Sequence, residues 1–207
     1  MDWPTVAAEQ HTVLRVPRVP KYAPTIRRAH DMPNRTAAAT RSNGKTKAPS
    51  FRSAIDLSAD TRRKMVDLIN KQVAGTLDLM TQTKHAHWNC KGPQFIALHE
   101  LFDDLAEGLE THLDTIAERA TALGGLVNGT VRMAAEASEL EEFPVAVVEG
   151  LAQVKALSER YAALGASVRE AIDAAEEAED KGTADLFTDM SRDLDKYLWF
   201  LEAHLQS

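Results

Sequence analysis

The sequence contains very little cysteine and no long apolar run. Cys90 is the single cysteine in 207 residues, which excludes an internal disulfide framework and fits a reducing, cytoplasmic location. Cys90 itself is expected to be a small buried hydrophobic residue rather than a nucleophile. No apolar stretch approaches the ~20 residues that a membrane span needs, so no membrane association is predicted.

Proline is scarce after residue 50, because six of the eight prolines precede it. Residues 1–52 also hold ten Lys or Arg against three acidic residues, a net charge of +7, whereas residues 53–207 hold fourteen against twenty-eight, a net charge of −14. Pro17, Pro20 and Pro24 recur too closely for a helix to form. Residues 1–54 are therefore predicted to be a disordered basic tail, and residues 55–207 to be the folded domain.

Convincing strand patterns are missing as well, and apolar residues recur instead at helical spacing. The expected helices are a first from the N-cap Ser58 to about Trp88, a second over 94–123, a short one over roughly 130–138, a third long one from Phe143-Pro144 to near Lys181-Gly182, and a last from Thr183 to Leu205. Gly92-Pro93 and Gly124-Gly125 supply the breaks around the second helix. The pattern predicts an all-α four-helix bundle with a short extra helix in the long connection between helices two and three.

The second expected helix carries two pairs of potential metal ligands. His99 and Asp103 are four residues apart, as are Asp114 and Glu118, so each pair projects from one face. Histidine nitrogen combined with carboxylate oxygen suits iron, manganese or zinc better than calcium or magnesium. Asp103 and Asp114, the nearest members of the two pairs, lie about 16 Å apart along the helix. Either the helix holds two separate metal sites, or a second chain completes one site. For any single one of these residues the alternative is that it binds no metal and is either a structural residue or a solvated surface residue.

The spacing favours closure by a second chain. The pairs are centred at about 101 and 116, so their midpoint coincides with the middle of a helix over 94–123. Two copies crossing antiparallel on a two-fold axis would place each His99/Asp103 pair opposite an Asp114/Glu118 pair. His87 joins the first pair, because Pro93 lies midway between His87 and His99 and a hairpin there brings both to one height.

The predicted metal and catalytic site therefore takes His87, His99 and Asp103 from one subunit, and Asp114 and Glu118 from the other. Glu107 and Glu110 lie on the same stripe near the proposed crossing. Burying these two carboxylates unpaired would be unfavourable, and the spacing leaves their accommodation open.

Three segments of the sequence form a recognisable signature: Thr83-Lys84-His85-Ala86-His87-Trp88-Asn89 with Gly92-Pro93, Phe95 and Leu98-His99-Glu100-Leu101-Phe102-Asp103; Asp114-Thr115-Ile116-Ala117-Glu118-Arg119 to Leu123-Gly124-Gly125; and Ser191-Arg192-Asp193-Leu194-Asp195-Lys196-Tyr197-Leu198-Trp199-Phe200. They resemble the signature of the Dps family of mini-ferritins, DNA-binding proteins from starved cells. The resemblance covers roughly residues 55–207. It implies a hollow shell of twelve subunits, a dodecamer, with ferroxidase sites at two-fold interfaces.

The same resemblance implies iron as the metal, hydrogen peroxide as the preferred oxidant and a ferric mineral stored inside the shell, which would protect DNA from oxidative damage. The family's ligands fall on the same five positions that the spacing selects. The resemblance also places acidic residues of a pore for incoming ions near Asp185 and Asp189, for which a solvated face is the alternative. Trp88, beside His87, is either an electron donor to an oxidised intermediate or a packing residue at a helix end.

Other functions were weighed against the iron site. Larger ferritins pair Glu-x-x-His motifs inside one bundle, but no Glu here has a His three residues later, so a di-iron centre within one subunit is not expected. The alternative from another class is a nucleoid-structuring DNA-binding protein with little or no ferroxidase activity. That function would account for the basic tail but would leave the spacing of the five potential ligands unexplained. A bundle that served only as a scaffold would explain neither the tail nor the spacing.

The tail is predicted to bind DNA through phosphate contacts that do not depend on base sequence, which would make the protein nucleoid-associated. The basic residues assigned to this role are Arg15, Arg18, Lys21, Arg27, Arg28, Arg35, Arg41, Lys45 and Lys47. The alternatives are a solubilising tail and an organelle transit peptide, although the prolines argue against an amphipathic targeting helix.

Overall fold

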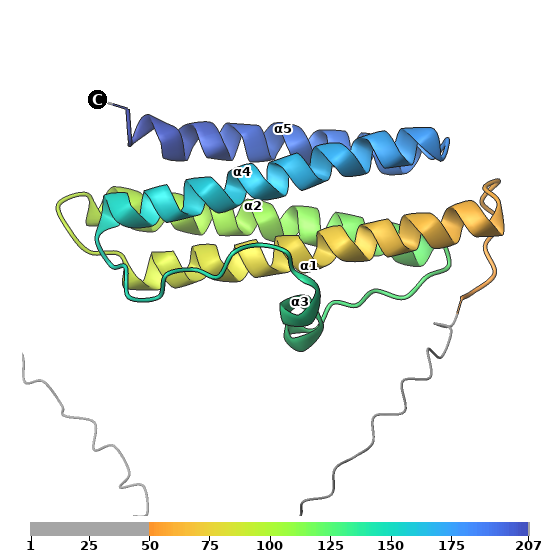
Figure 1. Cartoon of the computed structure of the whole chain (residues 1–207), viewed down its shortest axis with the longest axis horizontal. Helices are drawn as coiled ribbons and strands as arrows, with labels where there is room; N and C mark the ends of the chain where they lie inside the picture. The colour runs from red at the N-terminus through yellow and green to blue at the C-terminus, as the bar shows by residue number, and fades with distance from the viewer. Residues whose placement is uncertain (1–49, 207) are drawn as a thin grey trace, which may run out of the picture. The chain divides into compact units, whose positions relative to one another are not determined.

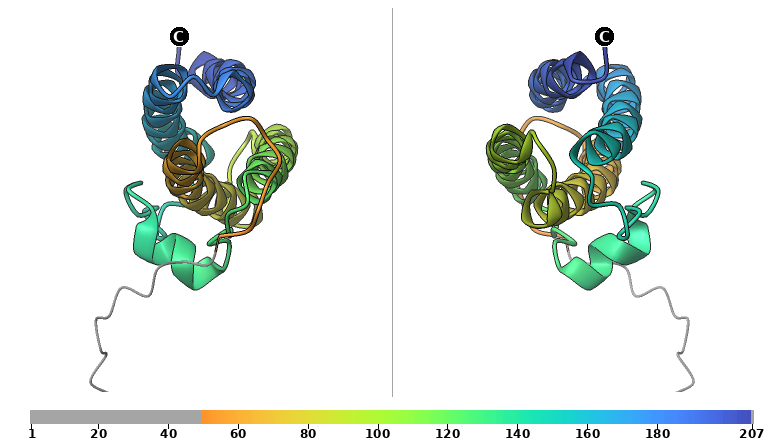
Figure 2. Two further views of the ribbon diagram at one scale, coloured as in Figure 1. Left: turned by 90° about the vertical axis from the view of Figure 1, so that its right-hand side faces the viewer. Right: turned by 90° about the vertical axis from the view of Figure 1, so that its left-hand side faces the viewer.

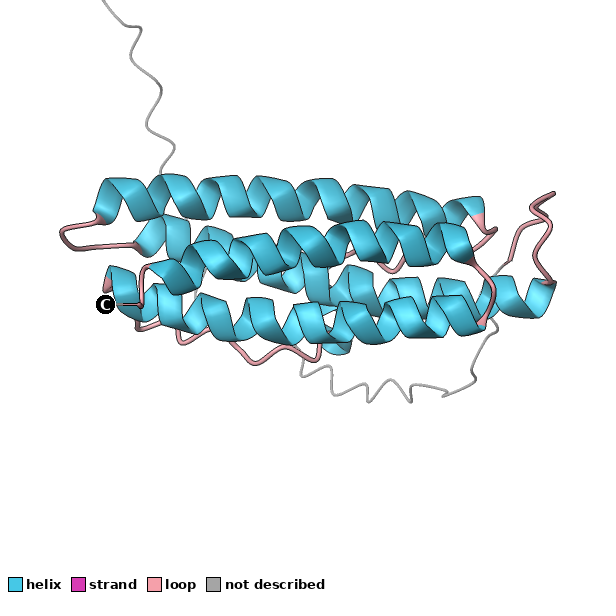
Figure 3. Cartoon of the chain, turned by 90° about the horizontal axis from the view of Figure 1, so that it is seen from above, coloured by secondary structure: helices cyan, strands magenta, loops and turns pink. Residues whose placement is uncertain are grey.

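The computed structural model describes residues 50–206, which form helices joined by loops (Figures 1 and 3). The helices are α1 (Ala59–Asn89), α2 (Phe95–Ala122), α3 (Val131–Ala137), α4 (Gly150–Glu177) and α5 (Lys181–Ala203). Within residues 50–206 there is no strand, only an isolated bridge between Lys91 and Glu149. None of the helices is long and apolar enough to cross a membrane. The predicted all-α bundle, with its short helix in the connection between the second and third long helices, is confirmed. The nine tail residues assigned to DNA lie outside the described residues.

Two antiparallel hairpins make up the bundle, α1 with α2 and α4 with α5. In Figure 1, α1 and α5 run in one direction and α2 and α4 in the other. The connection over 123–149 must therefore run back along the bundle before α4 begins. It carries α3, which packs outside the four long helices against α1 (Figure 2).

The apolar stripe of α2 faces the core, as its spacing predicts. Leu98, Phe102, Leu105, Leu109 and Ile116 are all buried there. Burial of side chains of this size supplies about 1.5–3 kcal/mol each relative to exposure. This stripe fixes the rotation of α2 about its axis, and so leaves its other face, with Asp114 and Glu118, in solvent.

The helix boundaries around α1 and α2 follow local signals. The Ser58 hydroxyl accepts a hydrogen bond from the Thr61 amide (3.0 Å) and caps α1, as expected. Gly124 ends α2 at φ +84°, where a Cβ would lie 2.4 Å from the carbonyl oxygen of Phe51. That close approach allows the Phe51 amide to donate to the Gly124 carbonyl (2.7 Å). The segment before α1 is thereby tied to the end of α2.

The predicted bounds of the third long helix are wrong at both ends. It begins at Gly150 rather than at Phe143-Pro144, because the backbone before it pairs with the α1–α2 turn: the Lys91 amide donates to the Val148 carbonyl (2.8 Å) and the Gly150 amide to the Lys91 carbonyl (3.0 Å). Glu149 then caps the helix with its carboxylate. At the far end the chain turns at Glu179, with φ +58°, instead of at Gly182.

Candidate metal centre

His87 and His99 face each other across the α1–α2 hairpin. Their rings stack with centroids 3.8 Å apart and an angle of 18° between the planes. Nδ1 of His87 donates to the carbonyl oxygen of His99 (2.7 Å), and Nδ1 of His99 donates to the carbonyl oxygen of His87 (2.9 Å). A carbonyl oxygen can only accept, so Nδ1 of each ring carries a proton, and in the neutral imidazole Nε2 then has the lone pair that binds a metal ion.

Asp103 lies one turn beyond His99 on α2, and Lys84 lies one turn before His87 on α1. The ammonium group of Lys84 forms an ion pair with the carboxylate of Asp103. This hydrogen bond lowers the pKa of Asp103 below its ordinary value, and the nearby imidazoles add to the effect. The carboxylate is therefore ionised, with a lysine cation beside it where a metal cation would bind.

Asp114 and Glu118 are separated from these three residues. Both are exposed on α2, and Asp114 lies about 16 Å along the helix axis from Asp103. Among residues 50–206, one group of three or more potential ligands has its ligand atoms within 4.8 Å of one another, and it is a different one: His112, Asp189 and Asp193. A single subunit thus holds two separate halves of the predicted five-residue site.

The exposed face of α2 also carries an open groove of about 740 Å³, which continues onto the loop after α2. Its lining includes Glu107, Glu110, Leu113, Asp114, Val127 and Gly129. Glu107 and Glu110 are both exposed, so both carboxylates remain in contact with water in a single subunit.

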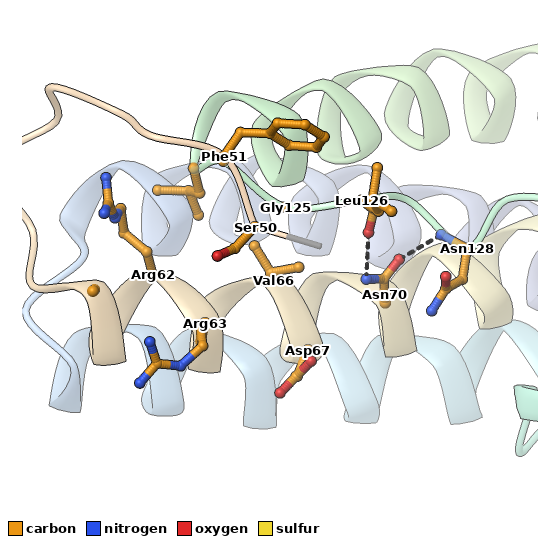
Figure 4. Close-up of a pocket in the computed structure, with 13 residues that line it drawn as sticks. Ser50, Phe51, Arg62, Arg63, Val66, Asp67, Asn70, Gly125, Leu126 and Asn128 are labelled. Carbon is orange, nitrogen blue, oxygen red and sulfur yellow. Dashed lines mark hydrogen bonds between the residues drawn. The ribbon is translucent and has the colours of Figure 1, made fainter. Parts of the chain in front are cut away.

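A second hollow, of about 290 Å³, lies where the segment before α1 meets the end of α2 (Figure 4). Arg62, Arg63 and Asp67 line it, and the Asn70 side chain bridges the Leu126 carbonyl (2.9 Å) and the Asn128 amide (2.8 Å) beside it. None of the five predicted ligands lines this hollow, so it is separate from the metal centre.

Comparisons with known proteins agree with this architecture. Residues 66–207 match the ferritin-like domain family. The chain is 45% identical over 151 residues to the DNA protection during starvation protein of Agrobacterium fabrum, a match that covers 73% of this chain and 93% of the relative. The chain belongs to the Dps family of mini-ferritins.

Solved Dps structures share the fold. Mycobacterium smegmatis Dps superposes with a TM-score of 0.73 at 30% identity, covering 76% of this chain and 96% of that one. A Dps protein from Vibrio cholerae, described as a member of a broad superfamily of ferritin-like diiron-carboxylate proteins, gives 0.71 at 25% identity and covers 74% of this chain and 96% of that one.

The other predicted residues that the structure describes, Trp88, Asp185 and Asp189, are all exposed in this Dps-family chain. Trp88 is 66% exposed, so it does not pack into the core of its own subunit. Asp185 and Asp189 are both exposed on α5, and Asp189 forms an ion pair with Arg192 (2.7 Å).

Two interactions at polar sites are absent from the sequence predictions. The spacing of Lys84 three residues before His87 could have placed it beside the site, since positions i and i+3 share a helix face. The hydrogen bond between His112 and Asp193 joins residues 81 apart in sequence. Its one sequence signal is a histidine on the otherwise apolar stripe formed by Leu109 and Ile116.

Proposed function

We propose that this protein oxidises ferrous to ferric iron at sites shared between two subunits and stores the ferric product inside a dodecameric shell. The observation that carries the proposal is the reciprocal pair formed by His87 and His99. It commits Nδ1 of both rings to the backbone and so leaves Nε2 of each imidazole as the nitrogen that can bind a metal, beside an ionised Asp103. Imidazole and carboxylate together are suitable ligands for ferrous iron.

The separation of Asp114 and Glu118 from the histidines supports completion of the site by a second subunit. Both carboxylates are exposed on the same helix that carries His99 and Asp103. An isologous contact between two copies of α2 would bring Asp114 and Glu118 of the partner subunit to the histidine pair, and would make two equivalent sites.

In the proposed reaction ferrous iron is the substrate and hydrogen peroxide the oxidant. Two ferrous ions each lose one electron, and one peroxide with two protons accepts both electrons and becomes two waters. The protein residues hold ferrous ions with coordination positions left open for the oxidant. Consuming iron and peroxide together prevents them from forming hydroxyl radical, which would protect nearby DNA.

Binding of DNA is the second part of the proposal. Relatives are named for DNA protection, and the N-terminal 52 residues carry a net charge of +7. Several such tails on one shell would bind the phosphate backbone together, with avidity greater than that of one tail. The protein would then be associated with the nucleoid.

Anaerobic loading with ferrous iron followed by peroxide tests the proposed reaction. Ferric absorbance should rise rapidly, with about two irons oxidised per peroxide consumed, and the mass of the assembly should be that of twelve subunits plus iron. If iron is oxidised no faster than in buffer alone by a correctly assembled shell, the ferroxidase assignment is wrong and the DNA-structuring alternative is favoured.

A further inference from the structure

The geometry points to a second metal site within each subunit, formed between α2 and α5 by His112, Asp189 and Asp193. We propose that it binds an exchangeable divalent cation of the first transition series. All three ligands come from one chain, so this site needs no partner subunit and does not depend on the ferroxidase proposal.

The three side chains already converge. Nε2 of His112, a buried residue, donates to Oδ2 of Asp193 at 2.9 Å. One ligand atom from each of the three residues lies within 4.8 Å of the others. Two ligands bound to one ion at ~2.0–2.2 Å lie roughly 3–4 Å apart. Small side-chain shifts would therefore let an ion replace the proton between His112 and Asp193.

This cluster is not an extension of the predicted interface site. His112 and Asp114 are two residues apart on α2, which places them about 200° apart around the helix axis. In agreement, His112 is buried against α5 while Asp114 is exposed.

A local contact between α2 and α5 lies beside the ligands. Gly108 lies one turn before His112, and a Cβ there would lie 2.1 Å from the hydroxyl oxygen of Tyr197. Tyr197 in turn lies one turn after Asp193 on α5. The absence of a side chain at Gly108 therefore leaves room for the Tyr197 ring between the two helices, and rigid helices hold ligands more precisely than loops do.

The ligand set selects the kind of ion. An imidazole combined with two carboxylates favours iron, zinc or manganese over calcium and magnesium, which prefer oxygen ligands alone. Three protein ligands leave further coordination positions open, which is typical of exchangeable rather than structural sites. Arg192 competes for Asp189 through an ion pair in which both side chains are more than 60% exposed, and such exposed pairs are weak.

Cobalt titration of the assembled full-length protein tests the site. The test uses a double variant, His99→Ala with Asp114→Ala, in which both halves of the proposed ferroxidase site are disabled. A chelator first removes any bound metal. In this background we expect Co²⁺ to bind with visible absorption bands at one ion per subunit. Adding Asp189→Asn or His112→Gln should weaken that binding at least about tenfold, since loss of even an outer-shell partner weakens metal binding that much.

Asp195→Asn is the matched control. Asp195 also lies on α5, but its carboxylate pairs with Arg169 (2.9 Å) and is outside the cluster. Asp189 is exposed, so its substitution does not threaten folding, and circular dichroism with shell mass checks the His112 variant. Equal Co²⁺ binding by the background and both cluster variants would overturn the site. So would equal loss in the Asp195 control, which would indicate nonspecific binding to surface carboxylates.

Discussion

His87 and His99 each donate the Nδ1 proton to the backbone carbonyl oxygen of the other residue, at 2.7 and 2.9 Å. The ring orientation is therefore set by the backbone of the α1–α2 hairpin and not by a carboxylate partner. Gly92, at φ +116°, turns the chain between the two helices in a conformation that favours glycine. Because the two hydrogen bonds are reciprocal, a shift in the register of the hairpin would break both of them.

Replacing Asp103 should remove a ligand while preserving the shape of the site. Asp103→Asn keeps an oxygen to accept from Lys84 but loses the negative charge that binds a metal ion. We expect the rate of ferrous oxidation to fall at least about tenfold, with the shell mass unchanged. Asp104→Asn is the control, because Asp104 is the exposed neighbour of Asp103 on α2. Stopped-flow ferric absorbance compares the two variants, and equal rates would remove Asp103 from the ligand set.

Removing the Lys84 cation should tighten metal binding at neutral pH. Lys84→Gln deletes a positive charge beside Asp103, and for an ion pair that is only partly buried we expect about a two- to fivefold gain in affinity for Zn²⁺. The folded pKa of Asp103 is lowered by Lys84, so the stabilisation from their pairing is complete above the unfolded pKa of ~3.9 and is lost as pH falls through the lowered folded value.

Between pH 6 and 7.5, therefore, Asp103 is ionised in both proteins, and the affinity ratio should not depend on pH. Isothermal titration calorimetry at several pH values measures this ratio. Weaker binding by Lys84→Gln would show instead that the ammonium group positions the Asp103 carboxylate for the metal.

Much of the fold follows from local sequence signals, whereas the exceptions depend on contacts between distant residues. The N-cap Ser58 and the left-handed Gly124 lie where their chemistry predicts. The late start of α4 could not be predicted, because the Val148 carbonyl and the Gly150 amide bond to the backbone of Lys91, more than fifty residues earlier. The turn at Glu179 violates the usual preference for glycine at positive φ, and so the sequence favoured Gly182 instead.

The polar sites likewise include one pairing that the local sequence predicts and one that depends on contact between distant helices. The midpoint position of Pro93 is enough to predict that His87 and His99 lie together, since a hairpin must pair residues equidistant from its turn. Pairing between His112 and Asp193 requires knowing that α5 packs on α2. No periodicity within either helix carries that information.

Cys90 should react slowly in the folded protein. It is fully buried, and burial raises the pKa of its thiol, with Glu149 adding to the effect. Because the thiolate is the reactive form, an aromatic disulfide reagent at pH 8 should label native shells at least about tenfold more slowly than protein unfolded in guanidinium. Fast labelling of native shells would show that the end of α1 opens locally.

Deleting the tail should abolish DNA binding and leave iron oxidation intact. The deletion should end at residue 48, because Phe51 is tied to Gly124 and should be kept. A full-length variant with the nine assigned basic residues replaced by Gln separates charge from length. Both proteins should lose gel retardation of DNA, and wild-type retardation should weaken steeply as salt increases. Retardation by the deletion variant equal to that of wild type would assign DNA binding to the bundle.

Mixing two inactive variants tests whether the metal site is shared between subunits. In a dimer of one His99→Ala chain and one Asp114→Ala chain, one site combines both defects. The other combines the intact histidine half of the second chain with the intact carboxylate half of the first. Random 1:1 co-refolding makes about half of the dimers mixed, so about a quarter of all sites should oxidise iron.

The matched control mixes His99→Ala with Asp103→Asn, whose defects lie in the same half, so every site stays broken. Activity that peaks at equal amounts in the first mixture but stays near zero in the second requires a shared site. Two flat responses in shells of correct mass would mean that each subunit carries its own complete site, and that the contact between two copies of α2 inferred from Asp114 and Glu118 is wrong.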